Sequence, residues 1–316
     1  MVISRNTTCP KKQVTQTRQA SASSIAVSFL VVAPLVLSTA LAPAQADDTH
    51  NHSDETEFYI GLDGLEVFPT GTYAGLENPN YNRLTFLFAH RHEETPESNH
   101  FHGIGAYSYS GSLDNLTINS TNTNNRIPES YSEQPPQTLL LGTGFYAGRL
   151  ISTPTNKEYS NLTIEPVVSL KASKKLGNQY LFNSSNGRWQ SSIEGANVGL
   201  ELASISTGLN VGDSAGVDIF KSVGDIYTIG IGDNFSFTPT FWTDAAAPLG
   251  TYSASFKLVD LGNGNNPIPF KESGTFSFDF EVKTVPESST VLGLGIVGLL
   301  ALSLSRLQKL TRNSLN

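Results

Sequence analysis

Apolar and polar residues alternate with a period of two in several segments, the pattern of a strand with one face in a core and one in water. The clearest runs lie at 84–88, 198–203, 252–258 and 276–282. Clusters of Gly, Asn, Asp and Pro separate these runs, and 114–136 is long enough to form an exposed loop. The pattern predicts an all-β fold in the form of an antiparallel β-sandwich. A variant of this prediction has two sandwich-like lobes, at 55–175 and 190–285.

The first 46 residues have the layout of an export signal. Basic residues occur in 1–24 without any acidic residue, an apolar stretch follows at 25–42, and Ala44-Gln45-Ala46 ends the segment. This order predicts a signal peptide that is cleaved before Asp47. The single cysteine, Cys9, precedes the apolar stretch, so we expect the mature chain to contain neither disulfides nor thiolate ligands.

The carboxyl end, 286–316, resembles the PEP-CTERM sorting signal of bacterial surface proteins. Pro286-Glu287 precedes an apolar run at 291–304, and Arg306, Lys309 and Arg312 follow it. Ser288 replaces the second proline of that signal. The resemblance implies transient membrane anchoring by the apolar helix, cleavage by an exosortase-type sorting enzyme, and a location at the cell surface or in the extracellular matrix.

Charge restricts the partners of the secreted body, 47–285. The whole chain has a formal charge of −8, and removal of both ends leaves 13 basic and 27 acidic residues, a net charge of −14. Binding to a nucleic acid backbone requires a basic face, so this composition excludes nucleic acid as a partner. An acidic surface attracts cations instead.

All six histidines occur in His-x-His pairs between residues 50 and 102. The pairs are His50/His52, His90/His92 and His100/His102. Neutral imidazole binds zinc and similar divalent metals, and a body without thiolates offers only nitrogen and oxygen ligands. The pairing predicts a metal site.

The spacing of the second and third pairs predicts a hairpin. Residues two apart on a strand share a face, and the polar connection 93–99 fits a loop between antiparallel strands. A symmetric register places His92 opposite His100 and His90 opposite His102, so that four imidazoles form the primary site. The further candidates are Glu93, Glu94 and Glu97 as ligands or outer partners, and His50 with His52 as a secondary site.

Several segments resemble the zinc-repressor-regulated PEP-CTERM proteins of cyanobacteria. These segments are NYNRLTFLFAH (80–90), HFHGIG (100–105), RIPESY (126–131), GTGFYAG (142–148), FTPTFW (237–242) and GTY (250–252). A more remote similarity links the chain to His-bearing anchored surface repeats associated with zinc transport. The resemblance implies synthesis under zinc starvation and a role in zinc acquisition or retention at the cell envelope, with an envelope metal-uptake system as recipient.

Together these observations predict an exported, surface-sorted protein without enzymatic activity that binds Zn²⁺ or a similar divalent metal. Two alternatives remain open at this point. One is an extracellular metalloenzyme, since three histidines with an open position can activate water. The other is a matrix-structural or carbohydrate-binding module.

Overall fold

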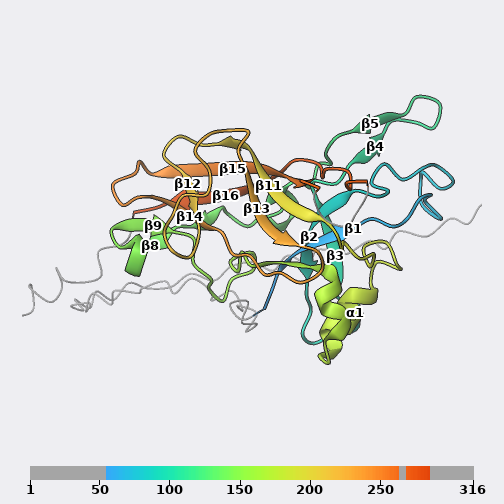
Figure 1. Cartoon of the computed structure of the whole chain (residues 1–316), viewed down its shortest axis with the longest axis horizontal. Helices are drawn as coiled ribbons and strands as arrows, with labels where there is room; N and C mark the ends of the chain where they lie inside the picture. Colours follow the sequence, from blue (N-terminus) through green and yellow to red (C-terminus); the bar gives the residue numbers. More distant parts are fainter. Residues whose placement is uncertain (1–54, 263–267, 285–316) are drawn as a thin grey trace, which may run out of the picture. The chain divides into compact units, whose positions relative to one another are not determined.

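The computed structural model describes residues 55–262 and 268–284, and strands predominate over helices in them (Figure 1). The all-β prediction is therefore confirmed. The predicted export signal, the sorting segment, and the pair His50 and His52 lie outside the described residues. Within the described ranges, no helix combines the length and apolarity needed to cross a membrane.

Most strands belong to three sheets. The first, called the site sheet, has the strand order β10-β1-β2-β3. The second, called the central sheet, has the order β13-β11-β15-β16-β6, and β7 also pairs with β16. The third sheet has the order β12-β14-β9-β8. Most pairs are antiparallel, whereas β1/β10, β16/β6 and β16/β7 are parallel. A separate hairpin joins β4 and β5. The strand bounds are β1 Phe58–Leu62, β2 Leu84–His90, β3 His100–Ile104, β4 Ser108–Ser110, β5 Thr117–Asn119, β6 Arg126–Ile127, β7 Gln137–Thr138, β8 Leu140–Leu141, β9 Arg149–Ile151, β10 Ile164–Pro166, β11 Asn197–Ile205, β12 Asn210–Gly212, β13 Ile226–Ile231, β14 Thr240–Asp244, β15 Gly250–Asp260 and β16 Phe276–Val282.

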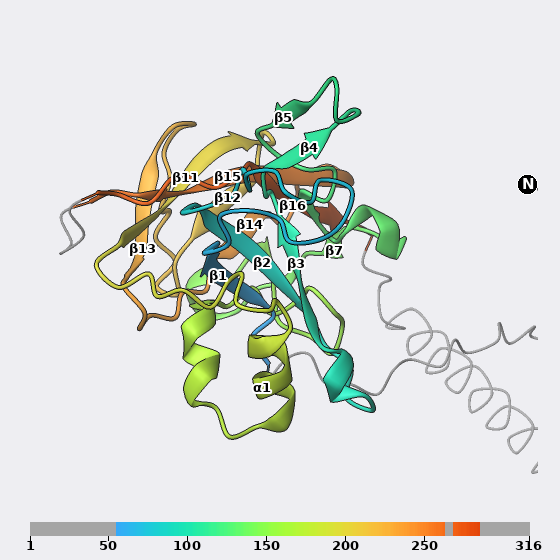
Figure 2. The same ribbon diagram turned by 90° about the vertical axis from the view of Figure 1, so that its right-hand side faces the viewer.

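Helical segments are short. They are η2 Pro96–Ser98, η3 Ser130–Ser132, η4 Gly144–Tyr146, η5 Val167–Ala172 and α1 Leu176–Asn183. Of these, α1 and η5 lie beside the site sheet (Figure 2).

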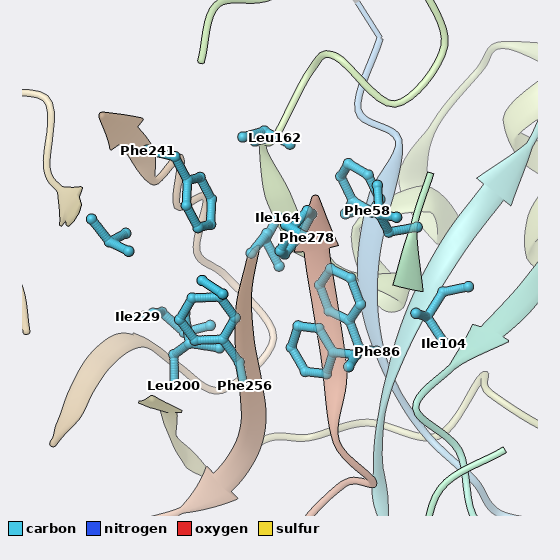
Figure 3. Close-up of a cluster of buried hydrophobic side chains, with 14 of the residues drawn as sticks. Phe58, Phe86, Ile104, Leu162, Ile164, Leu200, Ile229, Phe241, Phe256 and Phe278 are labelled. Atoms are coloured by element: carbon cyan, nitrogen blue, oxygen red, sulfur yellow. The ribbon is translucent and has the colours of Figure 1, made fainter. Parts of the chain in front are cut away.

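The core lies where the site sheet packs face to face on the central sheet (Figure 3). Phe86 of β2 stacks on Phe276 of β16 with ring centroids 4.1 Å apart, and Phe58 of β1 meets Phe278 edge to face at 5.5 Å. Phe241 of the third sheet packs on Phe278 at 5.4 Å. Phe86 and Phe276 come from the two predicted lobes, so both segments contribute to this one apolar cluster.

The period-two pattern correctly identifies the inward face of the central sheet. Phe276, Phe278, Phe280 and Val282 are buried, whereas Ser277 and Glu281 between them are half-buried. Asp279, expected on the same solvated face, is buried instead and forms an ion pair with Arg126. Alternation of this kind is typical of a sheet with one face in the core.

The site sheet departs from that pattern because it is buried on both faces. Thr85 and Leu87, expected on a solvated face, are 1% and 0% exposed. Leu87 belongs to a second apolar cluster, formed by residues of β1–β3, η5 and α1 together with Trp189. Gly61 permits this packing, since a Cβ there would lie 2.8 Å from the Cβ of Trp189.

We expect Phe86→Ala to lower the free energy of unfolding by about 3–5 kcal/mol, because it removes a fully buried ring from the interface between two sheets. Urea unfolding measures this change. Phe145→Ala is the matched control, since Phe145 is 75% exposed, and it should change stability by less than about 0.5 kcal/mol. Equal losses in both variants would contradict the assignment of the core.

Candidate metal centre

Three histidines lie together at the end of the site sheet because β2 ends and β3 begins with histidine. His90 pairs directly with His100, and Phe88 pairs with His102. The three side chains therefore continue the face that carries Phe86, Phe88 and Ile104. The register differs by two residues from the symmetric one predicted for the hairpin, which placed His92 opposite His100. A shift of two keeps every side chain on its face, so the predicted face survives the error.

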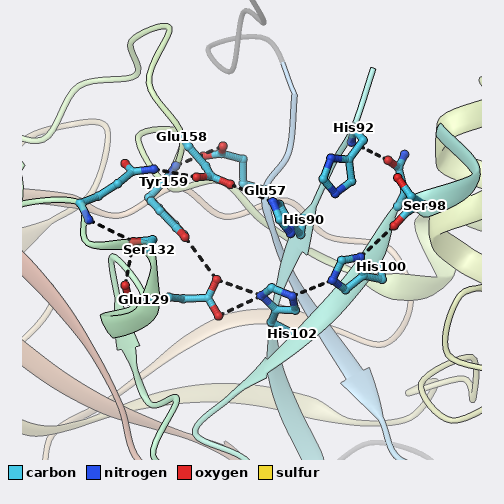
Figure 4. A network of polar contacts seen from close by, with 12 residues as sticks. Glu57, His90, His92, Ser98, His100, His102, Glu129, Ser132, Glu158 and Tyr159 are labelled. Carbon is cyan, nitrogen blue, oxygen red and sulfur yellow. Dashed lines mark hydrogen bonds and ion pairs between the residues drawn. The ribbon is translucent and has the colours of Figure 1, made fainter. Parts of the chain in front are cut away.

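The three imidazoles converge closely enough to hold one ion. Among the described residues, His90, His100 and His102 form a group in which one nitrogen from each ring lies within 4.8 Å of the other two. The Nε2 atoms of His100 and His102 are 2.8 Å apart (Figure 4). All three residues are half-buried. The site is thus partly desolvated yet accessible from one side.

Two of the histidines are oriented by hydrogen bonds at their other nitrogen. Nδ1 of His100 lies 2.8 Å from the carbonyl oxygen of Ser98, which only accepts, so Nδ1 carries the proton. Nδ1 of His102 lies 3.0 Å from both carboxylate oxygens of Glu129 and donates to them. The two Nε2 atoms face each other at 2.8 Å, a distance at which they share a proton in a hydrogen bond. A metal ion bound by both nitrogens takes the place of that proton.

His90 completes the group in a different way. Its Nε2 lies 3.8 Å from Oε1 of Glu158. Its Nδ1 is buried and has no hydrogen-bond partner within the described residues. A buried nitrogen without a partner is costly, and coordination of a metal would satisfy it.

The surroundings of His90 disfavour its protonation. Burial lowers the pKa of His90 to about 4, and charge repulsion from His92, His102 and His100 acts in the same direction. The carboxylate of Glu129 opposes this shift. His90 is therefore neutral near pH 7, the form that binds metals.

Glu129 is the centre of a buried hydrogen-bond network. Its carboxylate is buried and accepts hydrogen bonds from Tyr131 at 2.7 Å, Tyr159 at 3.2 Å and Asn124 at 2.5 Å, in addition to His102. Burial raises the pKa of Glu129, but the hydrogen bonds from His102, Tyr131 and Asn124 outweigh burial and leave the pKa below its ordinary value. The carboxylate is thus held in its charged form.

Both tyrosine hydroxyls of this network donate to Glu129. Burial raises the pKa of both Tyr131 and Tyr159, and the nearby carboxylates raise it further. Their hydroxyl groups therefore stay protonated and stabilise the charge on Glu129.

Arg91 fixes the strand end from the opposite face. Its guanidinium group donates to the hydroxyl of Tyr59 at 2.9 Å and to Oδ1 of Asn178 in α1 at 2.8 Å, and it forms an ion pair with Glu55 at 3.5 Å. Burial raises the pKa of Tyr59 to about 12, so that hydroxyl is neutral. These contacts hold the backbone between His90 and His92.

The remaining predicted site residues lie near the three-histidine group but outside it. The ring of His92 is half-buried with its centroid 4.5 Å from that of His90, and its backbone N–H donates to Asn99 at 2.6 Å. Glu93, Glu94 and Glu97 are exposed in the connection between β2 and β3. They are not part of the three-ligand group found among the described residues.

Glu129 and Glu158 are functional candidates that sequence reasoning did not single out. Glu129 lies within 114–136, which was expected to be an exposed loop, yet β6 in this segment pairs with β16 and Glu129 is buried. The RIPESY segment at 126–131 is the signal that contains it. Glu158 lies between β9 and β10, in a segment without a recognisable motif.

Comparison of the chain with protein-family models, curated proteins and solved structures gives no significant match. The assignment of the site therefore depends on its geometry.

The low pKa of His90 predicts that the metal-free protein loses stability as the pH falls. Unfolded histidine takes up a proton below about pH 6.5, whereas folded His90 does so only near pH 4. The unfolded state thus binds more protons in this window, and stability decreases from pH 6.5 towards pH 4. Urea midpoints between pH 7 and pH 5, with a chelator present, measure this effect.

The matched control is His90→Gln, which should show a smaller decrease in midpoint over the same range. Glu129 also contributes acid sensitivity, because its depressed pKa makes its stabilising effect disappear at lower pH. The comparison therefore stops at pH 5. Identical pH slopes for the two proteins would contradict the buried, neutral state of His90.

Proposed function

We propose that this protein binds zinc or a similar divalent metal through His90, His100 and His102. The observation that carries the proposal is the convergence of three imidazole nitrogens within 4.8 Å, two of them on rings whose other nitrogen is bonded to an acceptor. Metal-bound histidines characteristically donate their second N–H to a carboxylate or a backbone carbonyl. Both kinds of acceptor are present here.

The ligand atoms follow from the tautomers. With Nδ1 of His100 and of His102 donating to their acceptors, each Nε2 offers a lone pair to the metal once their shared proton leaves. The buried Nδ1 of His90 has no hydrogen-bond partner within the described ranges. With zinc–nitrogen bonds of about 2.0–2.1 Å, tetrahedral ligands lie roughly 3.3 Å apart. A separation of 2.8 Å between the two Nε2 atoms needs only a small side-chain adjustment to reach that value.

We propose capture as the role of this site. The acidic body, with its net charge of −14 over 47–285, raises the local concentration of cations. The apolar core between the sheets consists of Phe, Leu, Ile and Val side chains and is formed without any contribution from a metal. Loading and release therefore need not unfold the protein.

The export signal, the sorting segment and the family resemblance support a location at the cell surface or in the extracellular matrix. In this proposal, an exosortase-type enzyme releases the protein from its transient membrane anchor. The bound metal then passes to an envelope uptake system, as zinc-regulated synthesis implies.

A metalloenzyme is the second candidate. Three histidine ligands leave a fourth position for water on zinc, which is the arrangement of catalytic zinc sites. The partial exposure of all three histidines favours this candidate, because it leaves room for a small exogenous ligand.

The purified protein, without a polyhistidine tag, should bind about one zinc ion in calorimetry at pH 7.5. His102→Ala removes one of three ligands. It should weaken metal binding by more than the ~10–100-fold that is typical when a hydrogen-bond partner of a ligand is lost. His92→Ala is the matched control, since it removes a neighbouring imidazole that lies outside the group, and it should have a much smaller effect.

Two results would contradict the proposal. One is a wild-type protein that binds no zinc, copper(II), nickel or cobalt(II) at micromolar concentration. The other is a loss of affinity in His92→Ala as large as in His102→Ala, which would place the metal elsewhere on the hairpin.

Deletion of 286–316 should release an exported protein into the soluble fraction. This segment contains the apolar run and the basic tail, which together form the proposed anchor. Fractionation of the producing cells and their medium measures the distribution. If the shortened protein remains in the membrane fraction to the same extent as the full chain, the sorting proposal is wrong.

A further inference from the structure

Each of the three histidines has an acceptor near one of its ring nitrogens. His100 has the carbonyl of Ser98 at 2.8 Å, and His102 has Glu129 at 3.0 Å. For His90, the corresponding acceptor is Oε1 of Glu158, which lies 3.8 Å from Nε2. This is longer than the roughly 2.7–3.2 Å of an N–H···O hydrogen bond, and a movement of less than 1 Å would complete the contact.

Glu158 is held in place by the surrounding structure. Its other oxygen, Oε2, accepts a hydrogen bond from Gln134 at 2.8 Å, and its side chain is 20% exposed. The loop that carries it is closed by Ser160, whose hydroxyl donates to the carbonyl of Lys157 at 2.7 Å. A carboxylate constrained in this way aims at His90 with little freedom to rotate away.

The next residue in the same loop links the two carboxylates of the site. The hydroxyl of Tyr159 donates to Glu129 (Figure 4), and its ring packs on Phe88 with centroids 4.5 Å apart. One loop therefore places Glu158 3.8 Å from His90 and supports Glu129 behind His102. Two carboxylates next to three imidazoles also complement the charge of a divalent ion.

We propose that Glu158 is the positioning residue for His90: it accepts the proton on Nε2, turns the buried Nδ1 towards the ion and so makes His90 a ligand. This inference rests on the proposed function. It assigns Glu158 to the layer around the ligands, where Glu129 and the carbonyl of Ser98 serve the other two histidines. Carboxylates in this layer fix the tautomer and raise the basicity of the imidazole.

The test compares Glu158→Gln with Glu133→Gln in cobalt(II) and zinc titrations of the purified protein. Both variants remove one negative charge from the same region, but Glu133 is exposed and belongs to the turn that follows Tyr131. Glu158→Gln should weaken metal binding about 10-fold or more. It should also change the visible spectrum of bound cobalt(II). Glu133→Gln should leave that spectrum unchanged and should change the affinity by less than about 2-fold, as expected for an exposed charge.

A double-mutant cycle with His90→Ala separates positioning from direct ligation. If Glu158 acts through His90, then Glu158→Gln has no further effect on affinity once His90 is removed. A full additional loss in the double variant would overturn the proposal and make Glu158 a ligand in its own right. Thermal melting of each metal-free variant shows that the fold is retained.

The outcomes for the two proposals are distinguishable. Wild-type affinity and an unchanged cobalt(II) spectrum in Glu158→Gln would overturn the role of Glu158 and leave the three-histidine site standing. Equal losses of metal affinity in Glu158→Gln and Glu133→Gln would show that only the removal of a negative charge matters. That result would also overturn the role of Glu158. Absence of metal binding by the wild-type protein would overturn both proposals.

Discussion

The packing of phenylalanine rings between the site sheet and the central sheet is the interaction on which the rest of the structure depends. Phe86 on Phe276 and Phe58 on Phe278 join strands far apart in sequence. The same face of β2 and β3 then passes directly from Phe88 and Ile104 to histidine. The packing that fixes the positions of β2 and β3 in the aromatic core therefore also holds the histidines together.

This transition from core to rim explains the chemistry of the site. On its inner side, apolar packing desolvates His90 and keeps it neutral, as a ligand must be. On its outer side, the segments around Glu129 and Glu158 supply charged acceptors, and tyrosine hydroxyls stabilise the charge of Glu129. A cluster of imidazole nitrogens beside carboxylates suits a divalent cation better than an anion or an apolar ligand.

Local patterns predicted much of the fold. Alternation identified the buried face of β16, and the His-x-His spacing placed imidazoles on one face of a hairpin, because side-chain direction on a strand repeats every two residues. The second buried face of the site sheet was not predicted. The local pattern predicts Leu87 on the solvated face, and only its packing in one cluster with Trp189 and residues of η5 and α1 buries it.

The sequence by itself determined that histidine, and not thiolate, would supply the ligands, and that β2 and β3 would bring paired imidazoles to one face. The tertiary structure alone decided which three converge, because the pairing of His90 with His100 depends on how both strands pack in the core. It also decided that Glu129 and Glu158 lie beside these histidines. Both carboxylates come from segments whose position is determined by contacts distant in sequence, and no local periodicity encodes such contacts.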